Sequence, residues 1–153
     1  MKKEIEGLLE EIFVGNFYSY VGLGDTWEFL FDRFYLIAQE ITAPEEEKLN
    51  KLLLDNAPSF LDTVDKEDVA KLTIAKRNSR KEIKKISIKN DSSLVLTFDK
   101  ERELCFTTST DIVDWQWCIN ESGKTPYEDL IVACLFSGEI EINNKKVENV
   151  FSL

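Results

Sequence analysis

The chain has 153 residues and no histidine. Histidine is the most frequent general base and metal ligand in proteins, so its absence excludes Ser-His-Asp and Cys-His catalysis. Carboxylate chemistry stays open, although no pair of acids stands out by its spacing. We therefore expect no catalytic residue, no metal site and no cofactor, and a protein that is not an enzyme.

Cysteine is scarce as well: the three are Cys105, Cys118 and Cys134, and no CxxC pair occurs. An odd number without a spacing pattern argues against a disulfide framework or a zinc site. Because their neighbours are apolar and typical of strands, we expect buried thiols in a reducing compartment. Among the few glycines, Gly22 and Gly24 suggest a turn, and a lone GxG without a βαβ pattern does not indicate a phosphate loop.

No run of about 18 apolar residues is present, so we expect no transmembrane helix and no membrane partner. Acids interrupt the apolar positions of the opening "MKKEIEGLLEEIF", which therefore does not resemble a secretory signal. We expect a cytoplasmic protein with a single domain over residues 1–153. An apolar fraction of 43% and a charged fraction of 31% are ordinary for a soluble globular domain.

Acids outnumber bases 29 to 19, which gives a net charge of −10. The bases gather in residues 69–89, where eight face a single acid, so the acidic excess lies on either side of this stretch. A net acidic protein repels nucleic acid and attracts basic partners. The basic stretch "KRNSRKEIKK" lacks interleaved aromatics, which favours an edge strand guarded by lysines over a nucleic-acid site.

Most of the helices are expected within residues 1–65. One apolar face predicts a helix over residues 2–13. Residues 26–41 fit either a helix or two strands, and their β-forming residues favour a strand pair broken at Asp32-Arg33. A further helix is expected from Pro44 to Asn56, followed by a short helical turn over residues 59–64. In the helix from Pro44 to Asn56, the residues expected to form the buried stripe are Leu49, Leu52 and Leu53.

From Lys66 onward polar and apolar residues alternate, which predicts an antiparallel sheet after residue 68. Its buried positions include Ile86, Ile88, Leu94 and Leu96. "LIVACLF" fits a buried strand or a short core helix, "ESGKTPYED" a loop, and "EIEINNKKVENVF" a hairpin turning at residues 143–144. The predicted fold class is α+β, with N-terminal helices packed on a mainly antiparallel β-sheet.

The segment "DIVDWQWCIN", residues 111–120, has the period of a strand with one buried face. Val113, Trp115, Trp117 and Ile119 would lie on that face, opposite Asp114, Gln116 and Cys118. Both tryptophans are then core residues. The alternative is an aromatic anchor at the edge of an interface.

The stretch "SLVLTFDKERELCFTTSTDIVDWQWCI" resembles small bacterial immunity proteins that accompany polymorphic toxins. The resemblance covers roughly residues 86–136 and extends to "WEFLFDRFYLIAQEI". It is a pattern of strands with a DWxW tail, so no binding residue is carried over from it. It implies a cytosolic, non-enzymatic α+β protein that neutralises a cognate toxin.

Charge and resemblance together suggest an immunity protein whose partner is a basic toxin domain, for instance a nuclease. For the contact set we expect the acids Glu45, Glu46, Glu47, Asp111 and Asp114, although the three glutamates also fit the solvent face of a helix. One alternative is an acidic inhibitor from a phage or plasmid that mimics nucleic acid. A carboxylate-dependent hydrolase is less favoured, because Asp111 and Asp114 would point to opposite faces of a strand.

Overall fold

A computed structural model describes residues 1–124 and 130–151. The chain begins with α1 (Lys2–Phe13) and the strands β1 (Tyr18–Leu23), β2 (Trp27–Phe31), β3 (Phe34–Ala38) and β4 (Ile41–Thr42). Three helices follow: α2 (Glu46–Asn56), α3 (Pro58–Leu61) and α4 (Lys66–Asn78). The rest comprises β5 (Lys85–Ile88), β6 (Leu94–Thr97), the 3-10 helix η1 (Asp99–Glu101), β7 (Glu103–Phe106), β8 (Trp115–Glu121), β9 (Val132–Leu135), β10 (Ile140–Ile142) and α5 (Asn144–Phe151).

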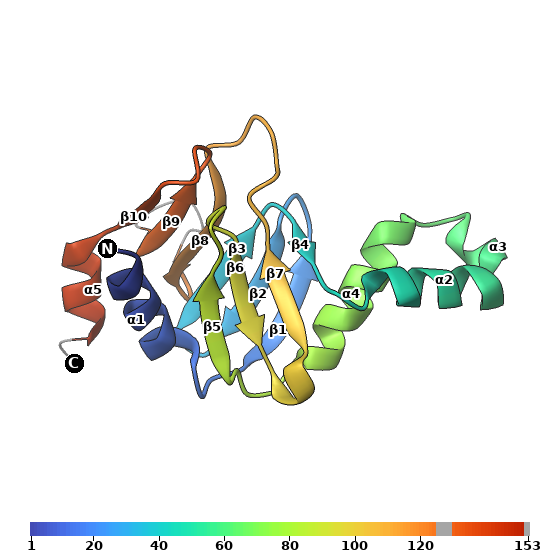
Figure 1. The fold of residues 1–153 in the computed structure, drawn as a ribbon, viewed down its shortest axis with the longest axis horizontal. Coiled ribbons are helices and arrows are strands. Elements are labelled where there is room, and N and C mark those ends of the chain that lie inside the picture. Colours follow the sequence, from blue (N-terminus) through green and yellow to red (C-terminus); the bar gives the residue numbers. More distant parts are fainter. Residues whose placement is uncertain (125–129, 152–153) are drawn as a thin grey trace.

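The strands form two antiparallel sheets, one in the order β1-β2-β3-β8-β9-β10 and the other in the order β4-β7-β6-β5. The sheets pack face to face, and the Phe29 and Phe106 rings meet edge to face 5.1 Å apart between them. Helix α1 packs against β5, and helix α4 packs against β1 (Figure 1). The predicted α+β class is confirmed.

Several predicted elements are confirmed. Helix α1 buries Ile5, Leu9, Ile12 and Phe13, as its pattern indicated. Residues 26–41 form the strand pair β2 and β3, which breaks at Asp32-Arg33. "LIVACLF" contains the buried strand β9. The predicted loop over residues 121–129 lies partly outside the described residues, and its first residue, Glu121, ends β8.

Two segments that alternation assigned to the sheet are helices instead. Residues 66–78 form α4, because Asp65 caps its start by accepting a hydrogen bond from the Glu67 amide at 3.1 Å. Acids in its first turn and bases in its last turn complement the helix dipole. The hairpin expected at residues 143–144 is also wrong, since Asn143 accepts a hydrogen bond from the Lys146 amide where α5 begins.

Helix α2 lacks the buried stripe predicted for it. The structure describes all of α2, and none of its residues is buried; Leu52 is 59% exposed. The reason is that α2 packs on α4, which separates it from the two sheets. Helices α2 and α3, residues 46–61, therefore project beyond α4 as an arm (Figure 1).

Candidate functional site

Trp115 and Trp117 lie on opposite faces of the six-stranded sheet, so the prediction that they share one face is wrong. The cause is a bulge in β8. Trp115 pairs with Leu135 and Trp117 pairs with Cys134, so β8 advances by two residues where β9 advances by one. Trp117 enters the core between the sheets. Trp115 packs on the outer face, in a cluster with Ile37, Cys118 and Ala133.

The buried Gln116 side chain fixes the loop that precedes β8. Its amide donates to the Thr110 carbonyl at 2.8 Å and accepts from the Thr110 amide at 3.2 Å. The backbone carbonyls of Trp115 and Gln116 accept hydrogen bonds from Gln39. Residues 111–114 therefore form an anchored loop instead of the expected start of a strand. Asp111 and Asp114 are exposed on this loop.

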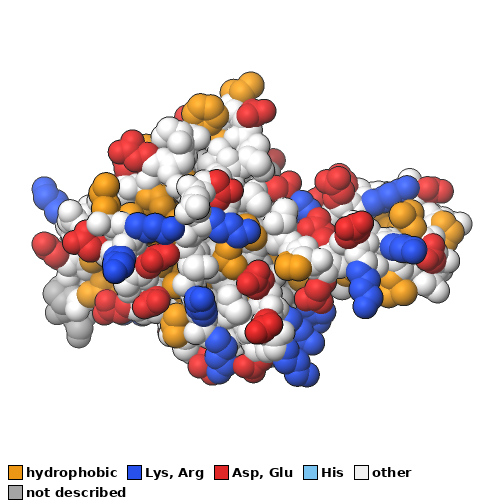
Figure 2. Space-filling model, in the orientation of Figure 1, with side chains coloured by type: hydrophobic (Ala, Val, Ile, Leu, Met, Phe, Trp, Pro, Cys, Tyr) orange, Lys and Arg blue, Asp and Glu red, His pale blue; other side chains and the backbone are white. Residues whose placement is uncertain are grey.

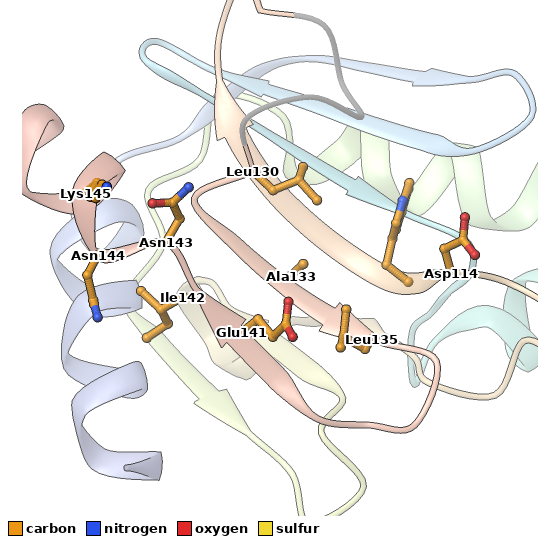
Figure 3. A pocket seen from close by; sticks show the side chains of 10 residues that line it. Asp114, Leu130, Ala133, Leu135, Glu141, Ile142, Asn143, Asn144 and Lys145 are labelled. Atoms are coloured by element: carbon orange, nitrogen blue, oxygen red, sulfur yellow. The ribbon is translucent and has the colours of Figure 1, made fainter.

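A hollow of about 530 Å³ lies on the outer face, at the end of the sheet that contains β9 and β10 (Figure 3). Trp115, Leu130, Ala133 and Leu135 supply its apolar surface. The amide of Phe136 donates to the Asp114 carbonyl at 3.1 Å, which places Asp114 beside the end of β9. We call this site the outer-face hollow.

The charged rim of the outer-face hollow consists of Asp114, Glu141 and Lys145, all exposed. Figure 3 shows the Asp114 and Glu141 carboxylates on different sides of the apolar residues Ala133 and Leu135. An apolar surface with an aromatic residue and a charged rim is the usual composition of a protein-binding hot spot. The excess of acid on this rim suits a basic side chain with an apolar stem, such as arginine.

The predicted glutamates lie elsewhere, at the start of the arm. Glu45 accepts a hydrogen bond from Arg77 of α4 at 2.6 Å, and this bond holds the pKa of Glu45 below its usual value. Glu46 lies 3.6 Å from the Nζ atom of the buried Lys71. Glu47 is exposed. Two of the three glutamates thus fasten α2 to α4.

The structure therefore divides the predicted contact set between two surfaces. Asp111 and Asp114 belong to the loop beside the outer-face hollow, whereas the glutamates belong to the arm on the far side of α4 (Figure 1). Sequence reasoning missed Leu135, Glu141 and Lys145, because Leu135 reaches Trp115 only through the pairing of β8 with β9, and Glu141, with Lys145 just after it, joins the hollow only through the pairing of β9 with β10. No local pattern signals these pairings.

The predicted burial of the three cysteines is confirmed, and all three thiols are free. Burial raises the pKa of Cys134 to about 11 and also raises the pKa of Cys118. Within residues 1–124 and 130–151, no group of three or more potential ligands could hold a metal ion. No helix in this part of the chain is long and apolar enough to cross a membrane.

Comparisons with models of protein families, with curated proteins and with solved structures find no match to this chain.

Proposed function

We propose that this protein binds a basic bacterial toxin domain and neutralises it, as a cognate immunity protein. The observation that carries the proposal is the outer-face hollow, where the carboxylates of Asp114 and Glu141 border an apolar surface that includes Trp115. A net charge of −10 adds long-range attraction for a basic partner. Binding alone accounts for neutralisation, so no catalytic group is required.

The two parts of the hollow act at different stages of binding. The carboxylates of Asp114 and Glu141, together with the overall charge, accelerate encounter with a basic surface. The apolar surface around Trp115 then holds the complex and slows dissociation. Association should therefore slow strongly as salt rises, while dissociation changes less, because salt mainly screens long-range attraction.

The test is co-expression with the toxin domain sought in the neighbouring gene, as the variable C-terminal domain of a large protein. The wild-type chain should restore growth, and the purified proteins should form a complex. The double variant Asp114→Lys/Glu141→Lys reverses both acids at the rim and should lose most of the affinity. Failure of the wild-type chain to restore growth contradicts the proposal.

A matched control separates the hollow from net charge. Glu10→Lys/Glu11→Lys makes the same charge change on exposed residues of α1. This control should slow association only modestly and leave dissociation unchanged. If both double variants weaken binding equally, net charge accounts for the affinity and the hollow is not the binding site.

A further inference from the structure

Ile112, in the loop between β7 and β8, is 97% exposed and has a positive φ of 57°. The loop comprises residues 107–114 and projects beyond the two sheets (Figure 1). Single exposed apolar residues are normal on a protein surface, so exposure alone decides nothing. A positive φ, however, is strongly unfavourable for a β-branched residue. In the part of the chain that the structure describes, Ile112 is the only β-branched residue with a positive φ.

Folding gains nothing from an isoleucine at this position. Because the side chain of Ile112 is almost fully exposed, it adds no buried apolar surface that would offset the backbone strain. Asparagine or glycine would adopt the same φ at a lower cost. A residue that breaks a local rule without a gain in packing indicates a role outside folding, such as contact with a partner.

Hydrogen bonds hold the loop on both sides of Ile112, which is why the strained conformation persists. Before it, the Gln116 side chain pairs with the amide and the carbonyl of Thr110. After it, the Asp114 carbonyl accepts a hydrogen bond from the Phe136 amide at 3.1 Å. The Ile112 side chain is therefore presented at a fixed place, which lowers the entropy cost of inserting it into a partner.

The surroundings of Ile112 define the chemistry of that partner. Asp111 precedes it, and Asp114 follows two residues later at the rim of the outer-face hollow, at most about 7 Å along the chain. Neither carboxylate has an ion-pair partner within residues 1–124 and 130–151. Apolar and acidic side chains lie together where the loop projects (Figure 2). A complementary surface therefore has an apolar recess bordered by lysine or arginine.

We propose that Ile112 is the residue by which this protein selects its toxin. Its side chain inserts into an apolar recess of the basic toxin domain, and cations beside the recess pair with Asp111 and Asp114. This inference rests on the proposed function and deepens it, because Ile112 and the outer-face hollow form one interface. A basic domain without such a recess meets a protrusion held rigidly by the loop, so it binds more weakly.

The test measures both binding and stability of the variant Ile112→Asn, with the toxin domain from the neighbouring gene as the probe. Loss of the apolar side chain should raise the dissociation constant at least about tenfold, mainly through faster dissociation. Without the toxin, the same variant should raise Tm by about 2–8 °C, because asparagine tolerates a positive φ. A substitution that merely damages the fold would lower Tm instead.

Two control variants separate the apolar contact from other effects. Ile112→Val keeps the β-branch and most of the apolar surface, so it should leave Tm unchanged. It removes one methylene group and should weaken binding by less than about fivefold. Leu52→Asn removes an apolar side chain that is 59% exposed on the arm, away from the loop, and should leave binding unchanged.

The outcomes distinguish this inference from the proposed function. A wild-type chain that neither binds the toxin domain nor restores growth contradicts the proposed function, and the role of Ile112 falls with it. If wild type binds and Ile112→Asn binds equally well, only the role of Ile112 is overturned. A lower Tm for Ile112→Asn also overturns that role, because the fold itself would then require isoleucine.

Discussion

Replacing each tryptophan of the DWQW sequence with alanine should separate stability from binding. Trp117 is fully buried between the two sheets, and its indole Nε1 donates to the Ser92 carbonyl at 2.9 Å. Ser92 belongs to the turn that joins β5 to β6, so this bond connects the two sheets. Trp115 packs on the outer face, where it is 8% exposed and lines the edge of a hollow that opens to solvent.

The burial of each tryptophan sets the expected loss in the free energy of unfolding. Removing a buried tryptophan side chain from a core costs about 3–5 kcal/mol, and an unpaired Ser92 carbonyl adds about 1 kcal/mol. A small domain has only about 5–15 kcal/mol of stability, so Trp117→Ala should be close to unfolding. Trp115→Ala should cost less, about 2–3 kcal/mol, because Trp115 is 8% exposed but borders the hollow, so solvent can fill part of the space.

The assay is equilibrium urea unfolding, with toxin binding measured on the folded protein. Trp117→Phe is the matched control: it keeps much of the apolar volume, loses the bond to Ser92, and should cost about 1–2 kcal/mol. Trp115→Ala should keep enough stability to stay folded and should reduce binding of the toxin. The reasoning fails if Trp115→Ala destabilises as much as Trp117→Ala, or if Trp117→Ala costs less than about 2 kcal/mol.

Three further predictions concern buried titratable groups. Burial raises the pKa of the Tyr18 phenol, so above about pH 10 only the unfolded chain ionises there, and wild type should lose about 1.4 kcal/mol per pH unit relative to Tyr18→Phe. Parallel stability curves for these two proteins from pH 8 to 11 would contradict this. Because the thiols of Cys118 and Cys134 are buried with raised pKa values, a thiol reagent at about pH 8 should label native protein slowly and all three cysteines only after denaturation. Rapid labelling of three thiols in native protein would refute their burial. Burial opposes the charge of Lys71, but its hydrogen bond and attraction to Glu40 outweigh this and raise its pKa. Lys71→Met should therefore cost about 1 kcal/mol at neutral pH, because Glu40 stays partly hydrated. That deficit should shrink above about pH 10.5, because the unfolded chain releases the Lys71 proton there while the raised pKa keeps native Lys71 charged; a deficit that is constant to pH 11.5 would exclude the ion pair as its cause.

The elements that sequence reasoning identified correctly are those whose apolar period matches one buried face. Helix α1 and strand β5 are examples, because each buries one face against a single core. The strand pair of residues 26–41 was also correct, because its aromatic residues favour strands where the period alone was ambiguous.

The errors arose where tertiary contacts decide the outcome. Helix α4 packs only part of its surface, so its apolar residues follow a weak helical pattern, and the N-cap Asp65 was the overlooked signal. The leucines of α2 looked like a core stripe, but α4 keeps them from the sheets. The local sequence of β8 contains no signal that predicts the bulge, which places Trp115 on the outer face of the sheet.

The bulge in β8 connects the fold with the proposed function, because it places Trp115 on the outer face of the sheet and Trp117 in the core. The helices close the sides of the sandwich, and within the described residues none contributes to the apolar cluster on the outer face. Side chains of the sheet must cover that face themselves, and Trp115 does so over Ile37 and Cys118. The Gln116 side chain anchors the loop that contains Asp111 and Asp114, and the Trp117 side chain lies in the core. Because Trp117 and Gln116 fix the backbone next to Trp115 and Asp114, the proposed binding of a toxin would carry a smaller entropy cost than binding through a mobile loop.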